Sequence, residues 1–288
     1  MQARANHHRL SRAALATGLA LSALAVSQLA LAGPAAAVPG LTRQSSTGPS
    51  DSVAKTQNRA CPAGTVALGG GGAVTGATGN IGLDFMLPVS GNSTWSVTGR
   101  EDENGTSSNW SLSATALCAP APSGYQVVSG SSAWSSPSTK SHLVSCPVGK
   151  VALGVGGAVS GASTSELILE DLRIDTSSVT VTGAEDGTGF AADWQVQARA
   201  ICANQPAGYE RLLDDSVLSS TSVKSVTVTC SAGRRVHGVG AEILGGEGQV
   251  RLTAAHAVST TAVTATATED DNGFSGNWKV RAFAVCAN

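Results

Sequence analysis

The chain has 288 residues and a net charge of −2; only 4% of its residues are aromatic and 13% charged, whereas glycine occurs 34 times. The apolar fraction of 42% argues against a disordered chain, because such a composition can support packed cores. The near-equal numbers of basic (18) and acidic (20) residues create no positive field, which argues against nucleic acid as a partner.

Residues 1–37 have the pattern of an export signal. An arginine-containing start without acids precedes an apolar stretch over 13–32, and small-residue cleavage motifs end at Ala32 and Ala37. The alternative is a membrane-spanning helix, since about 20 apolar residues can cross a bilayer. We expect cleavage after Ala32 or Ala37 and a secreted, extracellular protein that no longer contacts the membrane.

The rest of the chain contains an internal repeat of about 84 residues. The matching positions, 84 or 85 residues apart, are Cys61, Cys146 and Cys230; Glu101, Glu185 and Glu269; Trp110, Trp194 and Trp278; and Cys118, Cys202 and Cys286. After a flexible lead-in over 38–52, we predict β repeats over 53–120, 121–204 and 205–288. The connections between them are short, so the repeats should be in contact.

All six cysteines lie in the exported part, and an even number in a secreted protein indicates disulfides. The simplest pairing is one bridge per repeat: Cys61–Cys118, Cys146–Cys202 and Cys230–Cys286. Bridges between repeats remain an alternative. Closing one such loop could contribute about 4 kcal/mol in the chain-entropy model, which matters for a unit this small.

The closing segment of each repeat alternates with a period of two, as a half-buried strand does. In the second copy Trp194 and Cys202 fall on the same face, so the bridge should lie in the core with the indole. Further strands are expected over 95–98, 141–146, 151–159, 167–174, 179–182 and 263–266. With about six strands per repeat and no helix, we predict an all-β fold: three disulfide-stapled modules, either separate small sandwiches or one pseudo-threefold assembly.

Each repeat opens with the frame C-x2-G-x4-G-x-G, which begins at Cys61, Cys146 and Cys230. A phosphate-binding loop is not supported, because no Lys-Ser or Lys-Thr follows the glycines. The frame favours a turn followed by a strand whose glycines allow bulges or close backbone packing.

This frame, with a later Trp-x-Val and a closing Ala-x-Cys-Ala, resembles a module of secreted actinobacterial proteins of unknown function. The resemblance covers nearly all of the mature chain and implies no catalytic residue. Three Cys-Pro-x-Gly units also look loosely like the vitelline membrane outer layer protein, a threefold β-prism whose repeats are shorter. The third copy departs from the frame, because Ser231 replaces the proline.

An acidic motif lies between two expected strands of each repeat. Its candidate ligand residues are Glu101, Asp102 and Asn104; Glu185, Asp186 and Asp193; and Glu269, Asp270 and Asn272. Acids and Asn-Gly favour a hairpin turn. The alternatives are a Ca²⁺ site or a glycan contact, because carboxylates and amides supply hard oxygen ligands.

Catalysis has little support in the sequence. Only His142, His237 and His256 remain after removal of the signal, and no nucleophile elbow or zinc-protease motif occurs. We therefore expect no enzyme, no catalytic residue, no metal site and no cofactor, with Ca²⁺ as the one alternative. The copies differ most over 80–92, 163–177 and 247–261, which indicates either a scaffold that displays different surfaces or drift in unselected loops.

These patterns favour a non-catalytic extracellular binding protein whose partner is a glycan or cell-wall polymer. Repetition supports this function, since weak sites gain from multivalency. Trp134 is the best candidate for an exposed aromatic residue at such a site. The alternatives are a structural or protein-interaction component of the cell envelope or of an extracellular complex, with another secreted protein as partner, and a secreted hydrolase.

Overall fold

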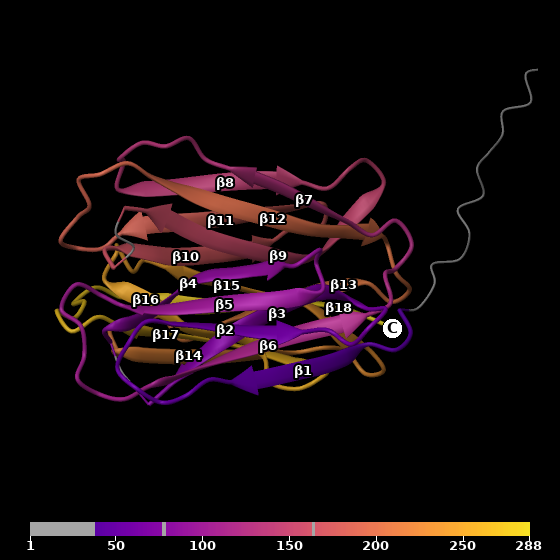
Figure 1. Cartoon of the computed structure of the whole chain (residues 1–288), viewed down its shortest axis with the longest axis horizontal. Helices are drawn as coiled ribbons and strands as arrows, with labels where there is room; N and C mark the ends of the chain where they lie inside the picture. The colour runs from indigo at the N-terminus through magenta and orange to yellow at the C-terminus, as the bar shows by residue number, and fades with distance from the viewer. Residues whose placement is uncertain (1–37, 77–78, 163–164) are drawn as a thin grey trace, which may run out of the picture. The chain divides into compact units, whose positions relative to one another are not determined.

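The computed structural model describes residues 38–76, 79–162 and 165–288, and they form 18 β-strands (Figure 1). These residues contain no helix that could cross a membrane. The expected export signal over 1–37 lies outside the described residues.

Each repeat contains six strands, as predicted. Repeat one has β1 (Thr42–Thr47), β2 (Lys55–Ala60), β3 (Val66–Thr75), β4 (Ile81–Val89), β5 (Thr94–Glu101) and β6 (Ser111–Ala119). Repeat two has β7 (Gln126–Ser131), β8 (Thr139–Ser145), β9 (Lys150–Gly161), β10 (Leu167–Ile174), β11 (Ser178–Glu185) and β12 (Trp194–Asn204). Repeat three has β13 (Glu210–Asp215), β14 (Val223–Thr229), β15 (Arg235–Leu244), β16 (Val250–Ala257), β17 (Ala262–Glu269) and β18 (Lys279–Ala287).

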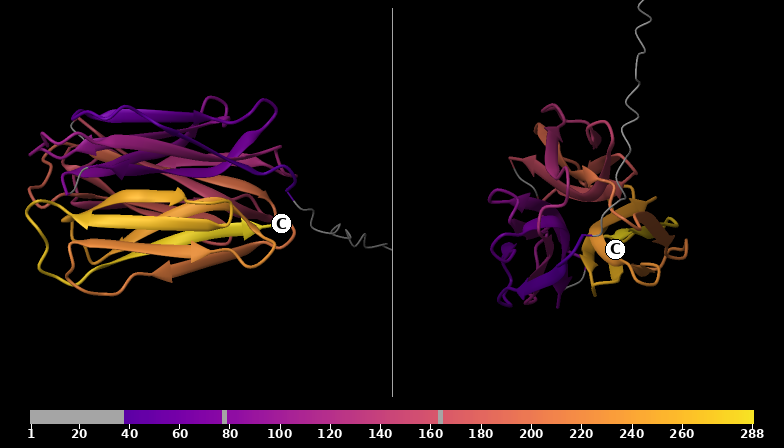
Figure 2. Two further views of the ribbon diagram at one scale, coloured as in Figure 1. Left: turned by 90° about the horizontal axis from the view of Figure 1, so that it is seen from below. Right: turned by 90° about the vertical axis from the view of Figure 1, so that its right-hand side faces the viewer.

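Every repeat divides its strands between two sheets. The first, third and sixth strands belong to one sheet, and the second, fourth and fifth belong to another. The three six-stranded sheets have the orders β1-β6-β3-β16-β17-β14, β13-β18-β15-β10-β11-β8 and β2-β5-β4-β9-β12-β7, so each joins half of one repeat to half of another. Figure 2 shows the repeats as three lobes around a common axis.

The junctions between repeats, here termed seams, are short antiparallel pairings of two residues each. They join β4 to β9 at the 1/2 seam, β10 to β15 at the 2/3 seam and β16 to β3 at the 3/1 seam. Because hydrogen-bonded sheets run through all three seams, the repeats form one pseudo-threefold assembly rather than separate sandwiches.

The seams explain the glycine frame. In repeat three, Gly233 has a φ of +82°, which suits the turn after the cysteine. A Cβ on Gly238 would collide with the backbone oxygen of Leu153, and one on Gly240 with that of Leu172. The equivalent glycines of the other two repeats also lie against the backbone of a neighbouring repeat. The expectation of a turn followed by close backbone packing is therefore confirmed.

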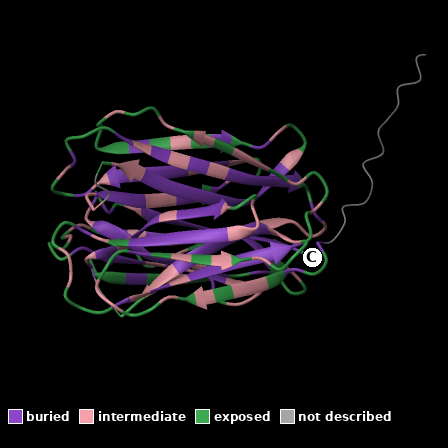
Figure 3. Ribbon diagram, in the orientation of Figure 1, coloured by how far each residue is buried: buried purple, intermediate pink, exposed green. Residues whose placement is uncertain are grey.

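The core of each lobe contains a disulfide and a tryptophan. The bridges are Cys61–Cys118, Cys146–Cys202 and Cys230–Cys286, which confirms the predicted pairing. Trp110, Trp194 and Trp278 are completely buried in the same core. Figure 3 shows buried residues along the inner strands and exposed residues in the loops.

The expected flexible lead-in over 38–52 is wrong, because β1 lies within it. This strand pairs with β6 over six residues, and the neighbouring Val38 and Leu41 are buried. Its sequence TRQSST shows no apolar alternation, and its pairing with β6 is made by backbone hydrogen bonds. Repeat one therefore begins before residue 53.

Candidate functional site

The first acid of each acidic motif fixes a buried tryptophan. The indole Nε1 of Trp110 donates to Glu101 at 2.8 Å, and the other two repeats have the same bond. Trp194 donates to Glu185 at 3.0 Å and Trp278 to Glu269 at 2.7 Å. These glutamates are therefore structural, since each satisfies the one polar group of a buried ring.

The second acid of each motif closes a turn. Asp102 Oδ1 accepts hydrogen bonds from the backbone N–H groups of Asn104 (3.1 Å) and Gly105 (3.0 Å). Asp186 accepts the equivalent pair in repeat two, and Asp270 accepts the Gly273 N–H. A turn is thus confirmed, but the expected hairpin is wrong, because the strands on either side of each motif (β5 and β6, β11 and β12, β17 and β18) belong to different sheets. Within the described ranges, no group of three or more His, Cys, Asp or Glu residues has an arrangement that could hold a metal ion.

The three acidic turns converge at one end of the assembly, opposite the C-terminus. Arg251 Nη2 lies 3.3 Å from Asp186 Oδ2, and its side chain is only 4% exposed. Burial raises the pKa of Asp102 and of Asp270, whereas the charge of Arg251 lowers both. One arginine from repeat three therefore faces an aspartate from every repeat.

Direct contacts also connect the turns of different repeats. Asp271 accepts hydrogen bonds from the side-chain amides of Asn80 (3.3 Å) and Asn104 (3.4 Å), which joins repeats three and one. The Thr188 hydroxyl donates to Glu103 at 3.4 Å, which joins repeats two and one. The convergence is therefore held by side chains as well as by the sheets.

Internal symmetry explains why a single arginine fits there. Arg251 occupies the position of Gly82 in repeat one and Ile168 in repeat two, as the strand registers show. A Cβ on Gly82 would lie 3.4 Å from Arg251 Cβ, so the arginine stem packs over the glycine. Arg251 lies in a segment that was expected to differ between the repeats, but no role was predicted for it.

Each repeat also has a buried lysine that was not predicted from the sequence. Lys55, Lys140 and Lys224 place Nζ 3.9, 4.7 and 4.5 Å from the ring centroids of the three buried tryptophans. Lys55 Nζ also donates to two backbone carbonyls, at 2.9 and 2.8 Å. These lysines recur at the same spacing as Cys61, Cys146 and Cys230, and that signal could have revealed them.

A polar cleft of about 460 Å³ opens beside the converging turns, between repeats two and three. Its lining residues include four acids (Glu170, Glu185, Asp186 and Glu247), two hydroxyl residues (Ser138 and Thr139) and three glycines, and none of its lining residues is basic. The lining of the cleft is therefore acidic, and both repeats two and three contribute to it.

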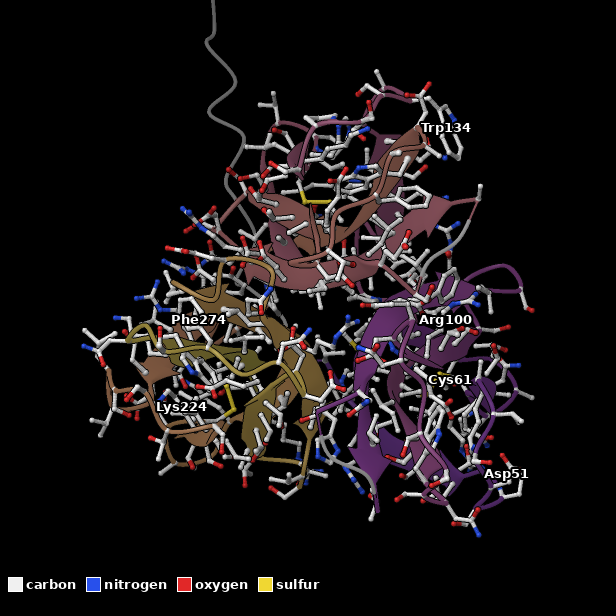
Figure 4. The ribbon with its side chains drawn as sticks, turned by 90° about the vertical axis from the view of Figure 1, so that its left-hand side faces the viewer. Asp51, Cys61, Arg100, Trp134, Lys224 and Phe274 are labelled. Carbon is white, nitrogen blue, oxygen red and sulfur yellow. A yellow bond between two sulfur atoms is a disulfide. The ribbon has the colours of Figure 1, made fainter. Side chains whose placement is uncertain are left out.

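The predicted site residues divide into two groups. Glu185 and Asp186 line the cleft, while the acidic residues of repeats one and three lie outside it. Asp193 and Asn272 are exposed and away from it. Trp134 is 55% exposed, as expected, and lies at the rim of repeat two in Figure 4. Glu170 and Glu247 also line the cleft but were not predicted as site residues. Their one signal in the sequence was that they lie in the middle segments that differ between the repeats.

No protein-family model matches the sequence, and no curated protein matches it. The resemblance to the secreted actinobacterial module and the looser one to the vitelline membrane outer layer protein therefore stay predictions.

Proposed function

We propose that this protein is a secreted, non-catalytic binding protein that recognises a glycan or cell-wall polymer through the cleft at the 2/3 seam. The cleft carries the proposal. Its volume of about 460 Å³ is within the range of small-molecule sites. Carboxylates, hydroxyls and backbone groups are the partners that sugar hydroxyls require for hydrogen bonding.

The compartment agrees with an extracellular ligand. Three disulfides indicate an oxidising, extracellular-type environment. The pattern over residues 1–37 adds secretion to the proposal.

The test is retention on insoluble cell-wall polysaccharide together with a glycan array. We expect retention by the wild type and weaker retention after Glu170→Gln, which removes one cleft carboxylate at nearly constant volume. Asp214→Asn is the matched control, because Asp214 is exposed on β13 outside the cleft. Absence of retention on every polysaccharide and glycan would refute the proposed function.

A second candidate is a protein-interaction component of the envelope or of an extracellular complex. It is favoured by exposed apolar side chains in two equivalent loops: Trp134 is 55% exposed, Val217 81% and Leu218 59%. Isolated exposed apolar residues are common, whereas a shared position in two repeats is a more specific observation. Loss of a captured secreted partner after Trp134→Ser and Leu218→Ser, with glycan retention unchanged, would favour this function.

A further inference from the structure

Repeats one and two place a carboxylate at the same point of the fourth strand. Asp84 is the extra residue of the bulge in β4, and Glu170 is the extra residue of the bulge in β10. The residue just before the first acid of each turn is Arg100 in repeat one and Ala184 in repeat two. The two repeats thus present the same acid position with different neighbours.

In repeat one a cation occupies the space next to this carboxylate. Arg100 Nε forms an ion pair with Asp84, which is only 4% exposed. The arginine and the aspartate together line a small cavity near the axis. The backbone geometry shared by the repeats therefore accommodates a positively charged group at this point.

In repeat two no protein cation takes that place. Ala184 is too short to fill it, and Ala184 and Glu170 both line the cleft. None of the ion pairs found among the described residues includes Glu170, whose carboxylate accepts a hydrogen bond from the Gly248 N–H. Burial raises the pKa of Glu170, as expected for a carboxylate without a nearby cation.

We propose that the cleft binds an amino sugar whose ammonium group contacts Glu170 in the place that the Arg100 guanidinium takes in repeat one. This inference rests on the proposed function, because it names the ligand class of the same site. The ammonium–carboxylate contact is a charge-assisted hydrogen bond of the kind that Arg100 makes to Asp84.

The other cleft groups suit a hydroxylated scaffold around that charge. The Glu185 carboxylate already accepts a hydrogen bond from the Trp194 indole, and the Asp186 carboxylate forms an ion pair with Arg251. Glu247, which is exposed, also lines the cleft, as do the hydroxyl residues Ser138 and Thr139. An amino sugar fits this arrangement better than a bare polyamine, because it supplies hydroxyls for these groups.

The same comparison predicts one site per molecule. In repeat three the bulge residue is Thr253, and the position of Arg100 is held by Thr268. Neither is an acid, so repeat three has no carboxylate at the point where repeats one and two have Asp84 and Glu170. At the 1/2 seam Arg100 already occupies the position.

Isothermal titration calorimetry with two matched oligosaccharides tests the proposal at a pH where the sugar amine is protonated. The glucosamine tetramer should bind at a single site. The N-acetylglucosamine tetramer, which lacks the charge, should bind about tenfold more weakly or worse, the effect of losing a charged hydrogen bond. Spermidine and a lysine-rich peptide are the probes for a cation without a sugar.

Two variants report on the cleft itself. Ala184→Arg rebuilds the arrangement of repeat one and should abolish binding of the glucosamine tetramer. Glu170→Gln should weaken it about tenfold. Asp214→Asn should bind like the wild type, and thermal unfolding will show whether each variant is folded.

The outcomes separate this proposal from the broader one. Equal binding of both tetramers, unchanged by Ala184→Arg and Glu170→Gln, would overturn the amino-sugar site and leave glycan binding intact. Failure of both tetramers together with no retention on any polysaccharide would overturn the proposed function as well. Binding of spermidine or the peptide but of neither tetramer would overturn the amino-sugar assignment.

Discussion

The 1/2 and 2/3 seams share one backbone arrangement but differ in the side chains that meet there. At the 1/2 seam the apolar Phe85 lies opposite Ala158, and the bulge carboxylate is paired with Arg100. At the 2/3 seam Asp171 lies opposite Glu242, and the bulge carboxylate of Glu170 is in none of the ion pairs found among the described residues. The close packing of glycines against a neighbouring repeat is therefore common to both seams, whereas the side chains of the fourth strand differ between them.

This comparison also explains where the three copies diverge. The fourth strands β4, β10 and β16 lie at the seams, and they fall within the segments 80–92, 163–177 and 247–261 that differ most between repeats. The divergence is therefore concentrated where two repeats meet rather than in the lobes.

A substitution at one of the glycines that pack against a neighbouring repeat should have the largest effect on stability. Gly238→Ala should lower the free energy of unfolding by about 3 kcal/mol, because the new methyl group meets the rigid backbone oxygen of Leu153. Urea denaturation measures the loss. Gly149→Ala is the control: its φ of +82° is strained for alanine but its surroundings are open, so about 1 kcal/mol is expected. Equal losses would contradict a role for close packing at the axis.

Much of this shared framework was predictable from the sequence. The spacing of Cys146 and Cys202 gave the disulfide, and the expected strand over 167–174 coincides with β10. Both follow from local patterns, namely a regular repeat and a period of two. The glycine frame also indicated close packing, although it did not identify the backbone that each glycine touches.

The side-chain contacts between repeats could not be predicted from the sequence. Pairing of β10 with β15 brings Asp171 to Glu242, residues 71 positions apart, and no local pattern encodes that juxtaposition. The same holds for the approach of Arg251 to Asp186. β1 was missed because backbone bonds to β6 hold a strand without apolar alternation.

Substitution of Arg251, which pairs with Asp186, should have the next largest effect on stability. Arg251→Met should lower the free energy of unfolding at neutral pH by about 3 kcal/mol, because it leaves the buried Asp186 without its cation. The loss should shrink as the pH falls and Asp102 and Asp270, whose pKa burial raises, become neutral. Chemical denaturation at several pH values measures both effects.

Ile168→Met is the matched control for this substitution. Ile168 holds the equivalent position in repeat two and is buried, so the exchange should cost less than about 1.5 kcal/mol at every pH. A pH-independent loss of the same size in both variants would show that the charge of Arg251 has no stabilising role.

Asp171 and Glu242, which lie opposite each other at the 2/3 seam, predict a further effect of pH on stability. Burial, with the charges of Glu242 and Glu170, raises the pKa of Asp171 from 3.8 to about 7. The folded state therefore favours the protonated form, so its stabilising contribution is complete below pH 3.8 and is lost as the pH rises through about 7.

Asp171→Asn removes this titration and should sharpen the comparison. Near pH 8 the variant should be more stable than the wild type by about 1 to 2 kcal/mol, a value reduced for the partial exposure of the side chain. The difference should disappear in acid. Thermal unfolding across this pH range measures it, and the exposed Asp214→Asn should show no such trend. A constant difference at all pH values would contradict the assigned pKa.

The smallest expected effect on stability comes from neutralising the two bulge carboxylates, Asp84 and Glu170, one at a time. Asp84→Asn should destabilise the protein by about 1 kcal/mol, because Arg100 loses a charged hydrogen bond. Glu170→Gln should leave stability unchanged or raise it by less than about 1 kcal/mol at neutral pH, because no protein cation depends on Glu170 and the desolvated charge disappears. Thermal unfolding of the two variants under one condition makes the comparison. Opposite signs at equivalent positions would mean that the carboxylate stabilises the fold at one seam and is kept at the other despite its cost. Equal losses would mean that Glu170 has an ionic partner within the protein, and the cleft would then lack the uncompensated charge that an ammonium ligand requires.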